Sequence, residues 1–441
     1  ISMDSFSSSH SLRTLFGAKF IIEPTPSAEN FLRHAAQILG KTAPVITSYG
    51  HTGWRNIGGR WVYLHAGGAI GADNIDVTLN EGGTALAAYR LPDSADGATS
   101  AMKRSLSILD LAPSNISVPL VAVAYLAPLL EIFNQANVPI GFSVFITGDS
   151  GTRKSTVAAL LLCHFGSFTR TTLPASFLAT ATSLERIAFI LKDSLLVIDD
   201  RYPTDNPREQ DQFTSTFSRI VREFNNRKGR SRCNADISLR PDYPPRGLGI
   251  FTMELSASGQ STVARGVEVL LEKSAIDLPK LTLLQEHSDE LAIAMRGFIE
   301  WVGANFDSLV TEVRKCFPDE RNAFQTAAQH GQIPEHLAAM QLAMHLMSHY
   351  GLSVGALTVQ GREDLLASSR QTLEGLGVHQ SHQVAEETPV EIMDRILEEL
   401  FAAKSVHLRA LTGGPPPHAE ALGWEKMDET EYRVPEHSAH I

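Results

Sequence analysis

Cysteine is scarce in this chain, which carries only Cys163, Cys233 and Cys316 among its 441 residues. The three lie far apart, so their spacing excludes both a disulfide framework and a zinc knuckle. Such sparse cysteine is typical of a reducing compartment, and no signal-peptide pattern is visible. We therefore expect a cytoplasmic protein.

Long uninterrupted apolar runs are also missing. The nearest is residues 118–133, where two prolines and Glu131 break the run before it reaches membrane-spanning length. We therefore expect no membrane-embedded segment. The rest of the composition, 43% hydrophobic and 20% charged, is ordinary for a globular protein. A chain of 441 residues has room for two to four domains.

Positive charge is in the minority, because 38 Lys and Arg face 49 Asp and Glu and leave a net charge of −11. An acidic chain argues against a protein that coats nucleic acid with its whole surface. The basic residues are nevertheless concentrated at 219–246. This segment can meet phosphate, either of DNA or of a neighbouring subunit's nucleotide, or it can be a solvated charged loop.

The most informative segment is a glycine-bearing loop between an apolar run at 140–146 and an apolar-periodic stretch at 157–162. The run predicts a buried strand and the stretch a helix, which is the layout of a phosphate-binding P-loop. Loop amides and the helix N-terminus can then surround the phosphates of a nucleotide. The predicted nucleotide-binding residues are Gly148, Asp149, Ser150, Gly151, Thr152, Arg153, Lys154, Ser155 and Thr156.

Two side chains of this loop have specific predicted roles. Lys154 is expected to reach the β- and γ-phosphates of ATP, and the Ser155 hydroxyl to bind Mg²⁺. The pattern departs from the usual one at Arg153, because glycine normally precedes the lysine. The loop by itself is therefore a degenerate match of a kind that also occurs by chance.

A second motif supports the first. The apolar residues 195–198 lead directly into Asp199 and Asp200, which is a Walker B pattern. A buried parallel strand is a continuous apolar run, and ligands bind at the carboxyl ends of such strands. We predict that Asp199 holds Mg²⁺ and that Asp200 orients or deprotonates the attacking water. The alternative is a plain core strand that ends in a capping acid.

Strands alternate with helical segments between residues 114 and 284, which predicts a parallel sheet and an α/β fold class. Strands are expected at 248–253 and 267–271, and helices at 181–191 and 213–224. The predicted division is an N-terminal α+β domain at 1–113, an ATPase domain at 114–284, a helical region at 285–412 and a linker or tail at 413–441.

The N-terminal part contains a strong strand candidate at residues 61–64, with Gly58 and Gly59 as a hairpin turn before it. Trp54 and Trp61 belong to this unit. They can either pack in a small β core or stack on the bases of a nucleic acid.

Several segments resemble, in the same order, a bacterial and phage family catalogued as domain of unknown function 927. They are residues 51–55, 59–71, 173–176, 199–200, 245–248, 252–254, 259–261 and 264–265. The resemblance spans about residues 16–285, and one departure is Met253, where glycine is expected. It implies an AAA+-like three-layer core related to minichromosome-maintenance-like helicases of mobile elements. The resemblance also implies that the chain works as an oligomer, a hexamer, which moves on DNA and is driven by ATP.

Two further positions are candidates for the chemistry. Glu254 or Thr252 ends the predicted strand 248–253 and can sense the γ-phosphate, although a strand-end cap is an equal alternative. Arg265 matches the position of an arginine finger, which stabilises charge on the phosphoryl group bound by a neighbouring subunit. Arg246 is the second candidate for the finger, and an ordinary surface salt bridge is the alternative.

A basic run lies between the second and third predicted ATPase strands. Its members are Arg227, Lys228, Arg230 and Arg232. Contacts from such a run to phosphates give sequence-independent DNA binding with strong salt dependence. A subunit contact and a solvated loop are the alternatives.

These observations favour a Mg²⁺-dependent ATPase that works as a hexameric DNA helicase or translocase of a phage or mobile element. One alternative is a nucleotide-gated remodeller or scaffold without a nucleic-acid partner. The other is a P-loop phosphotransferase, which would work as a monomer.

Overall fold

The computed structural model describes residues 27–42, 47–79, 83–202, 206–229, 233, 239, 242–254, 260–326, 331–386, 425–426 and 432–433. Contacts divide the chain into two units, Ile1–Ser48 and Tyr49–Ile441. The first unit contains the amphipathic helix α3 (Ala28–Gly40), with the apolar Phe31, Ile38 and Leu39 exposed. The central sheet and the candidate site belong to the second unit.

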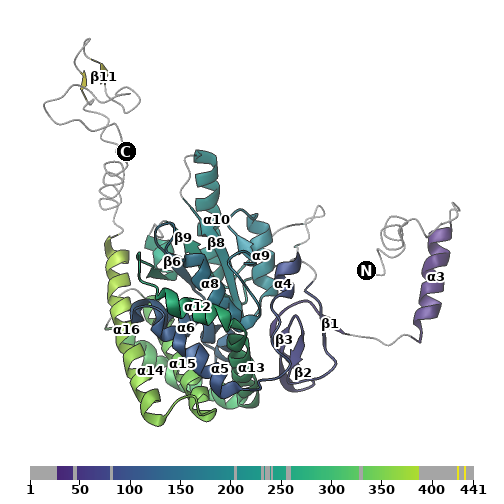
Figure 1. Cartoon of the computed structure of the whole chain (residues 1–441). Helices are drawn as coiled ribbons and strands as arrows, with labels where there is room; N and C mark the ends of the chain where they lie inside the picture. Colours follow the sequence, from purple (N-terminus) through teal and green to yellow (C-terminus); the bar gives the residue numbers. More distant parts are fainter. Residues whose placement is uncertain are drawn as a thin grey trace. The chain divides into compact units, whose positions relative to one another are not determined.

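A five-stranded parallel sheet forms the centre of the second unit (Figure 1). Its strands are β6 (Ser143–Thr147), β7 (Ala175–Ser176), β8 (Leu195–Arg201), β9 (Leu248–Met253) and β10 (Gly266–Leu270). Every neighbouring pair is parallel. Parallel neighbours need crossover connections, which the intervening helices supply. The predicted α/β class with a parallel sheet is confirmed.

The strand order is β10-β6-β9-β8-β7. Strand β9 is therefore inserted between β6 and β8, although it follows both along the chain. The carboxyl ends of parallel strands meet at one edge, so the residues after β6, β8 and β9 converge there. The glycine-bearing loop and the acid pair lie on either side of the end of β9.

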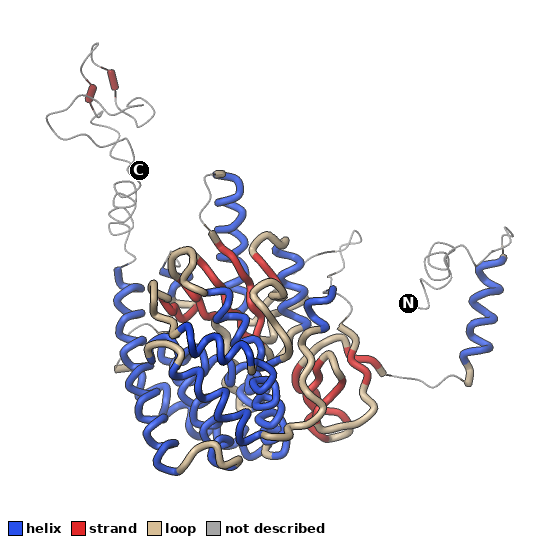
Figure 2. Tube along the Cα trace, in the orientation of Figure 1, coloured by secondary structure: helices blue, strands red, loops and turns tan. Residues whose placement is uncertain are grey.

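The strands are buried on both faces because helices flank the sheet (Figure 2). Helices α8 (Lys154–Leu162), α9 (Ala181–Ile190) and α10 (Pro207–Asn226) connect the strands, with the short η4 (Cys163–Phe165) and α11 (Gln260–Val263). Phe217 of α10 packs against Phe145 of β6 and Phe251 of β9, with ring centroids 5.4 and 6.0 Å apart. Burial of these rings fixes α10 on one face of the sheet.

The region after the sheet is helical, as predicted. It consists of α12 (Leu278–Glu286), α13 (Ser288–Ala304), α14 (Phe306–Phe324), α15 (Ile333–Ser353) and α16 (Val359–Glu386). A short antiparallel pair, β11 (Glu425–Lys426) and β12 (Tyr432–Arg433), is described beyond it. Buried side chains from Trp54 to Val384 form one contiguous core, and the four-part division of the chain stays a prediction.

One helical stretch in the described part of the chain, Ser114–Gln135, is long and apolar enough to cross a membrane. It comprises α6 (Ser114–Leu126), η3 (Ala127–Leu129) and α7 (Leu130–Gln135). The most apolar part of the stretch is completely buried inside the protein. Tyr125, for example, packs edge-on against Phe298 of α13 at 5.0 Å. In this fold the stretch is a core helix.

A small antiparallel sheet precedes these helices. It consists of β2 (Gly53–Ile57), β3 (Arg60–His65) and β4 (Gly68–Ile70). Gly58 and Gly59 have φ values of +60° and +84°, which a two-residue hairpin turn requires, so the predicted hairpin is confirmed. The other elements of this part of the chain are β1 (Ser48–Tyr49), β5 (Asp76–Val77), α4 (Gly83–Ala87), α5 (Ala98–Leu106) and η2 (Ser107–Asp110).

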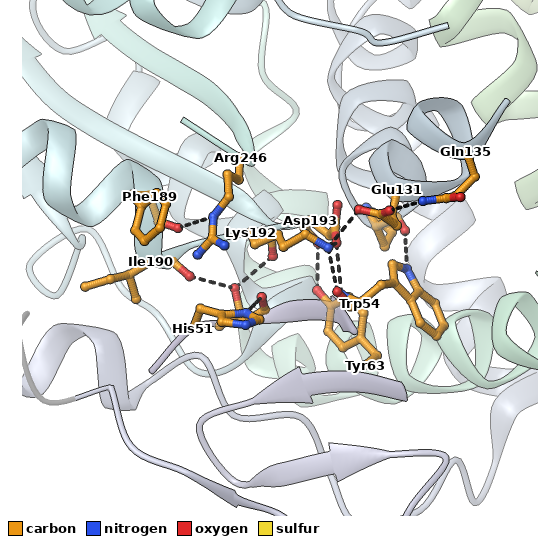
Figure 3. Close-up of polar contacts among 12 residues, drawn as sticks. His51, Trp54, Tyr63, Glu131, Gln135, Phe189, Ile190, Lys192, Asp193 and Arg246 are labelled. Carbon is orange, nitrogen blue, oxygen red and sulfur yellow. Dashed lines mark hydrogen bonds and ion pairs between the residues drawn. The ribbon is translucent and has the colours of Figure 1, made fainter. Parts of the chain in front are cut away.

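The small sheet is hydrogen-bonded to the segment that leads into β8 (Figure 3). The backbone N–H of Trp54 donates to the Asp193 carboxylate at 2.9 Å, and the Tyr63 hydroxyl donates to the Asp193 carbonyl at 2.7 Å. The indole N–H of Trp54 donates to Pro128 O at 2.7 Å. Trp54 is 2% exposed, so it is a core residue and not a platform for bases.

Lys192 supplies the counter-charge at this junction. Its ammonium lies 2.9 Å from the carboxylates of both Asp193 and Glu131. Burial raises the pKa of the Asp193 carboxyl, and the charge of Lys192 opposes that rise.

We expect Lys192→Met to destabilise the fold by about 3–5 kcal/mol at pH 7, because it leaves a buried carboxylate without its cation. The pKa of Asp193 then rises further above its unfolded value. The folded form binds more protons between the two pKa values, so the loss relative to wild type shrinks as the pH falls. Urea unfolding at pH 7 and pH 5 measures this, with Lys192→Arg as the matched control. An equal loss at both pH values contradicts the assignment.

Candidate functional site

The loop after β6 is shaped by three residues with positive φ, Gly148, Gly151 and Arg153, and by a close backbone approach. Gly148 has a φ of +145°, and a Cβ there would lie 2.3 Å from the carbonyl oxygen of Leu271. Arg153, at the N-cap of α8, has a φ of +73°. Glycine is the easy residue at such a position, and an L side chain costs about 1–2 kcal/mol there. The departure at Arg153 therefore preserves the turn at a cost in stability.

Lys154 is the first residue of α8, and its side chain extends back to the start of the loop. Its ammonium donates to the carbonyl oxygens of Gly148 at 2.7 Å and Asp149 at 2.8 Å, and the residue is 8% exposed. Burial lowers the pKa of Lys154, while nearby carboxylates, Glu254 foremost, raise it. The first turn of α8 has no side-chain cap, so its amides are available to an anion.

The acid pair forms a bulge just before the last residue of β8, Arg201. Ile198 pairs with Phe251 and Arg201 with Met253, so Asp199 and Asp200 together face the single residue Thr252. Asp200 has a φ of +69°. Bulges beside active sites re-aim side chains, and this one brings Asp200 to the cleft while the strand stays paired.

Thr252 connects the two acids. Its hydroxyl accepts a hydrogen bond from the Asp200 N–H at 2.9 Å and donates one to Oδ1 of Asp199. Burial raises the pKa of Asp200, the charges of Asp199 and Glu254 add to the rise, and Lys154 opposes it. The strand-end position of Thr252 thus orients the Asp199 carboxylate.

These elements enclose a cleft of about 190 Å³ at the carboxyl edge of the sheet. It is lined by Ser150, Gly151, Arg153, Lys154, Ser155, Thr156, Arg170, Asp200, Arg201, Thr252, Met253 and Glu254. The predicted Lys154, Ser155, Asp200 and Glu254 are therefore brought together. Asp199 lies next to them, held by Thr252.

A second hollow of about 360 Å³ adjoins the cleft, and the two share Arg153, Thr156 and Arg170. Its other lining residues come from α12: Leu278, Leu281, Thr282 and Gln285. A polar cleft that continues into a partly apolar hollow suits a ligand with a charged chain at one end and a ring at the other.

Two arginines of the cleft were not predicted. Arg201 is 5% exposed, lies 4.6 Å over the Phe217 ring and donates to the Met253 sulfur at 3.8 Å. Burial lowers its pKa. Its signal in the sequence is a cation directly after the acid pair. Arg170 is exposed in a loop without a motif, so only the fold places it.

Arg265 is not part of this cleft. It directly precedes β10, whose first residue, Gly266, pairs with Ser143 at the start of β6. The Ser143 N–H donates to Arg265 O at 3.4 Å. Arg265 therefore lies at the amino edge, about one strand length (~17 Å) from the loop. From that edge Arg265 does not reach its own cleft, and the predicted role in the site of a neighbouring copy stays a prediction.

The other basic candidates are placed as follows. Arg227 ends α10, and its guanidinium donates to Ile140 O at 2.8 Å and to Pro245 O at 3.3 Å. Because its donors are used inside the chain, the predicted phosphate contact does not fit Arg227. Lys228 is exposed. Arg230 and Arg232 lie outside the described residues.

The Thr252 bridge makes a testable contribution to stability. We expect Thr252→Val to destabilise the fold by about 1 kcal/mol, because the Asp200 N–H loses its acceptor in a partly buried site. Thr252→Ser keeps the hydroxyl and serves as the control. Urea unfolding of the two variants measures the difference. If the valine variant is as stable as wild type, the hydrogen bonds of the Thr252 hydroxyl do not stabilise the fold.

No curated protein matches the sequence. Among solved structures, one described as "SCCmec type IV Cch - active helicase" is similar in fold, with a TM-score of 0.58 and 15% identity. The similarity covers 94% of this chain and 75% of that chain. The family described as Domain of unknown function (DUF927) matches residues 2–242, more than half of the 441 residues. As its motifs indicate, the chain belongs to the DUF927 family.

Proposed function

We propose that this chain is an ATP-hydrolysing motor with a P-loop of AAA+ type, acting on DNA as a helicase or translocase. One observation carries the proposal: Lys154 of the glycine-bearing loop and Asp200 line the same cleft at the carboxyl edge of a parallel sheet. The similarity in fold to a structure described as an active helicase supports a motor over other nucleotide enzymes.

In this proposal the triphosphate lies on the loop amides and the first turn of α8. The Lys154 ammonium exchanges its two loop carbonyls for phosphate oxygens, which carry full negative charge and make stronger hydrogen bonds. The ribose and base occupy the hollow beside α12, where Leu278 and Leu281 provide apolar contact. Arg153 and Arg170 line both the cleft and the hollow, so in this orientation they lie beside the part of the nucleotide that joins the phosphates to the ribose.

Mg²⁺ fits the donor set at Ser155 and Asp199. The ion prefers oxygen ligands and usually takes one or two from protein, with phosphate and water supplying the others. Thr252 holds the Asp199 carboxylate in place for this role. When bound, Mg²⁺ neutralises charge on the phosphates.

The two remaining acids have different tasks. Asp200 orients the attacking water, and its raised pKa makes it a better proton acceptor than an ordinary aspartate. Glu254 follows β9 and lines the same cleft. It senses the γ-phosphate, either through charge repulsion or through a water molecule that contacts both groups. Arg265 of a neighbouring subunit completes the site, so the proposed active form is an oligomer, a hexamer by likeness to ring helicases.

A remodeller or scaffold without nucleic acid is the second candidate. The net charge of −11 and the internal use of the Arg227 guanidinium favour it. A monomeric P-loop phosphotransferase is a third, and the position of Arg265 away from its own cleft argues against it.

Turnover in the presence of single-stranded DNA tests the proposal. We expect ATP hydrolysis that rises several-fold on addition of single-stranded DNA, and an oligomer by light scattering after size exclusion with ATP. Hydrolysis that ignores DNA favours the remodeller. A monomer that transfers phosphate to an acceptor favours the phosphotransferase, and a chain that binds no ATP overturns all three.

A further inference from the structure

Arg201, to which the proposed mechanism gives no role, is a buried cation with weak partners. The residue is 5% exposed. Its guanidinium lies 4.6 Å over the ring of Phe217, and Nη1 donates to the sulfur of Met253 at 3.8 Å. No ion pair joins it to a carboxylate of the described residues. An aromatic face and a thioether sulfur are weak partners for a full charge.

The acids of the cleft do not neutralise this charge. Burial raises the pKa of Asp200, and the charges of Asp199 and Glu254 add to the rise. The charge of Lys154 opposes it, whereas that of Arg201 takes no part in the shift. Burial lowers the pKa of Arg201 itself, but the guanidinium is protonated at pH 7, because arginine keeps its proton in proteins. Charges this deeply buried are normally paired, so the expected partner is an anion that binds beside Arg201.

The guanidinium has donors left for such an anion. Of its nitrogens only Nη1 has a hydrogen-bond partner in the described chain. The buried polar atoms that lack a partner there include no nitrogen of Arg201, so its unpaired nitrogens are reached by solvent. Arg201 and Met253 both line the nucleotide cleft, which gives these donors access to a ligand in it.

The sheet places Arg201 beside one end of the proposed nucleotide. The residue directly follows Asp200, and the N–H of Glu254 donates to the Arg201 carbonyl at 2.9 Å. Arg201 therefore lies where β8 and β9 end, whereas the glycine-bearing loop follows β6 on the other side of β9. In the proposed binding mode that loop holds the β-phosphate, and the γ-phosphate extends toward the acid pair.

We propose that Arg201 binds the γ-phosphate of ATP in the cleft of its own chain and thereby distinguishes ATP from ADP. A guanidinium can donate two parallel hydrogen bonds to a phosphate, which the sulfur of Met253 cannot match. Phe217 supports the plane of the guanidinium, so the fork of donors is oriented before the nucleotide binds. The buried charge is paired when ATP is bound and unpaired when ADP is bound.

This inference rests on the proposed ATPase function and deepens it, because it names the residue that recognises the third phosphate. The role differs from that of Arg265, which is proposed to act on the nucleotide of a neighbouring copy. It also differs from that of Glu254, which carries the opposite charge. Loss of Arg201 is therefore expected to change nucleotide affinity, whereas loss of Arg265 is expected to change turnover alone.

The test is calorimetric titration of the full chain with ADP and with the slowly hydrolysed analogue ATPγS, each with Mg²⁺. We expect Arg201→Met to weaken binding of ATPγS by about 10- to 100-fold, the range for hydrogen bonds to a charged group. Affinity for ADP is expected to be unchanged, because ADP lacks the group that Arg201 contacts. Methionine keeps an apolar contact with Phe217 and removes the charge and its donors. Arg201→Lys keeps the charge without the planar fork and is expected to lose less affinity for ATPγS.

Thermal unfolding without nucleotide separates a ligand-binding arginine from a structural one. Removal of an unpaired buried charge is expected to leave the unfolding temperature of Arg201→Met equal to that of wild type or above it. Arg222→Met, which removes an exposed arginine from α10, is the matched control for both measurements.

Two results contradict the role of Arg201. An unchanged ratio of ATPγS to ADP affinity in Arg201→Met overturns the proposal, and a lowered unfolding temperature then identifies a structural arginine. An equal loss of ATPγS affinity in Arg222→Met also overturns it. A wild-type chain that binds neither nucleotide overturns the proposed function as well, so the two failures are distinguishable.

Discussion

Replacement of Lys154 by alanine is expected to lower ATP turnover by about 10³-fold or more. The ammonium is the one cation of the loop that is buried against the phosphate site, and removal of a single preorganised donor costs about 10²–10³ in rate. The variant also loses the two hydrogen bonds from the ammonium to the carbonyl oxygens of Gly148 and Asp149, which loosens the loop. Steady-state phosphate release at saturating ATP and Mg²⁺ measures the effect.

Lys273→Ala is the matched control for this variant. Lys273 pairs with Asp149 of the same loop at 3.0 Å, but its side chain is 75% exposed, so the pair is screened by water. We expect turnover within about twofold of wild type, the range of a surface pair worth less than 1 kcal/mol. Retained turnover in Lys154→Ala, or an equal loss in Lys273→Ala, would show that the loop is not the phosphate site.

Replacement of Arg265 by alanine is expected to lower turnover by about 10³-fold, with nucleotide affinity unchanged. An arginine supplied by a neighbouring subunit is worth about 10³–10⁵ in rate, because it stabilises charge that develops only in the transition state. Arg265 lies at the amino edge of its own sheet, so its loss leaves the cleft of the same chain intact. A titration with a fluorescent ATP analogue measures the affinity separately from turnover.

Mixing two inactive variants tests whether the arginine acts between subunits. The Arg265→Ala chain keeps an intact loop, and the Lys154→Ala chain keeps its arginine. A site between them is complete, so an equal mixture is expected to regain part of the turnover. Arg222→Ala is the control, since Arg222 is an exposed arginine whose charge reaches Arg265. Normal turnover of Arg265→Ala alone removes Arg265 from the site.

Elements with a strong local pattern were predicted closely. Strand β9 has the bounds expected for residues 248–253, and helix α9 begins at Ala181 as expected. Weak patterns were shifted or missed. The helix expected at 213–224 is α10, which begins earlier at Pro207 and ends at Asn226, and the two-residue strand β7 was not expected. A strand this short is defined by its pairing with β8, which no local pattern encodes.

The candidate site divides in the same way. Lys154, Ser155 and the acid pair could be named as candidates from the sequence because each has neighbouring residues that complete a recognisable motif. Arg170 and the bridge from Thr252 to Asp199 depend on residues far apart along the chain. For Arg227 the local pattern was misleading. The basic run predicted a phosphate contact, but the guanidinium donates to the carbonyl oxygens of Ile140 and Pro245, which are distant in sequence.

The sequence by itself determined the α/β class, the loop and the acid pair, because apolar runs, helical periodicity and glycine spacing act over a few neighbouring residues. The tertiary structure alone decided that β9 separates β6 from β8, that Asp200 turns into the cleft through a bulge, and that Arg265 lies at the opposite edge. Strand order, bulge geometry and edge position arise from hydrogen bonds and burial between distant segments. Those interactions exist only once the sheet has formed.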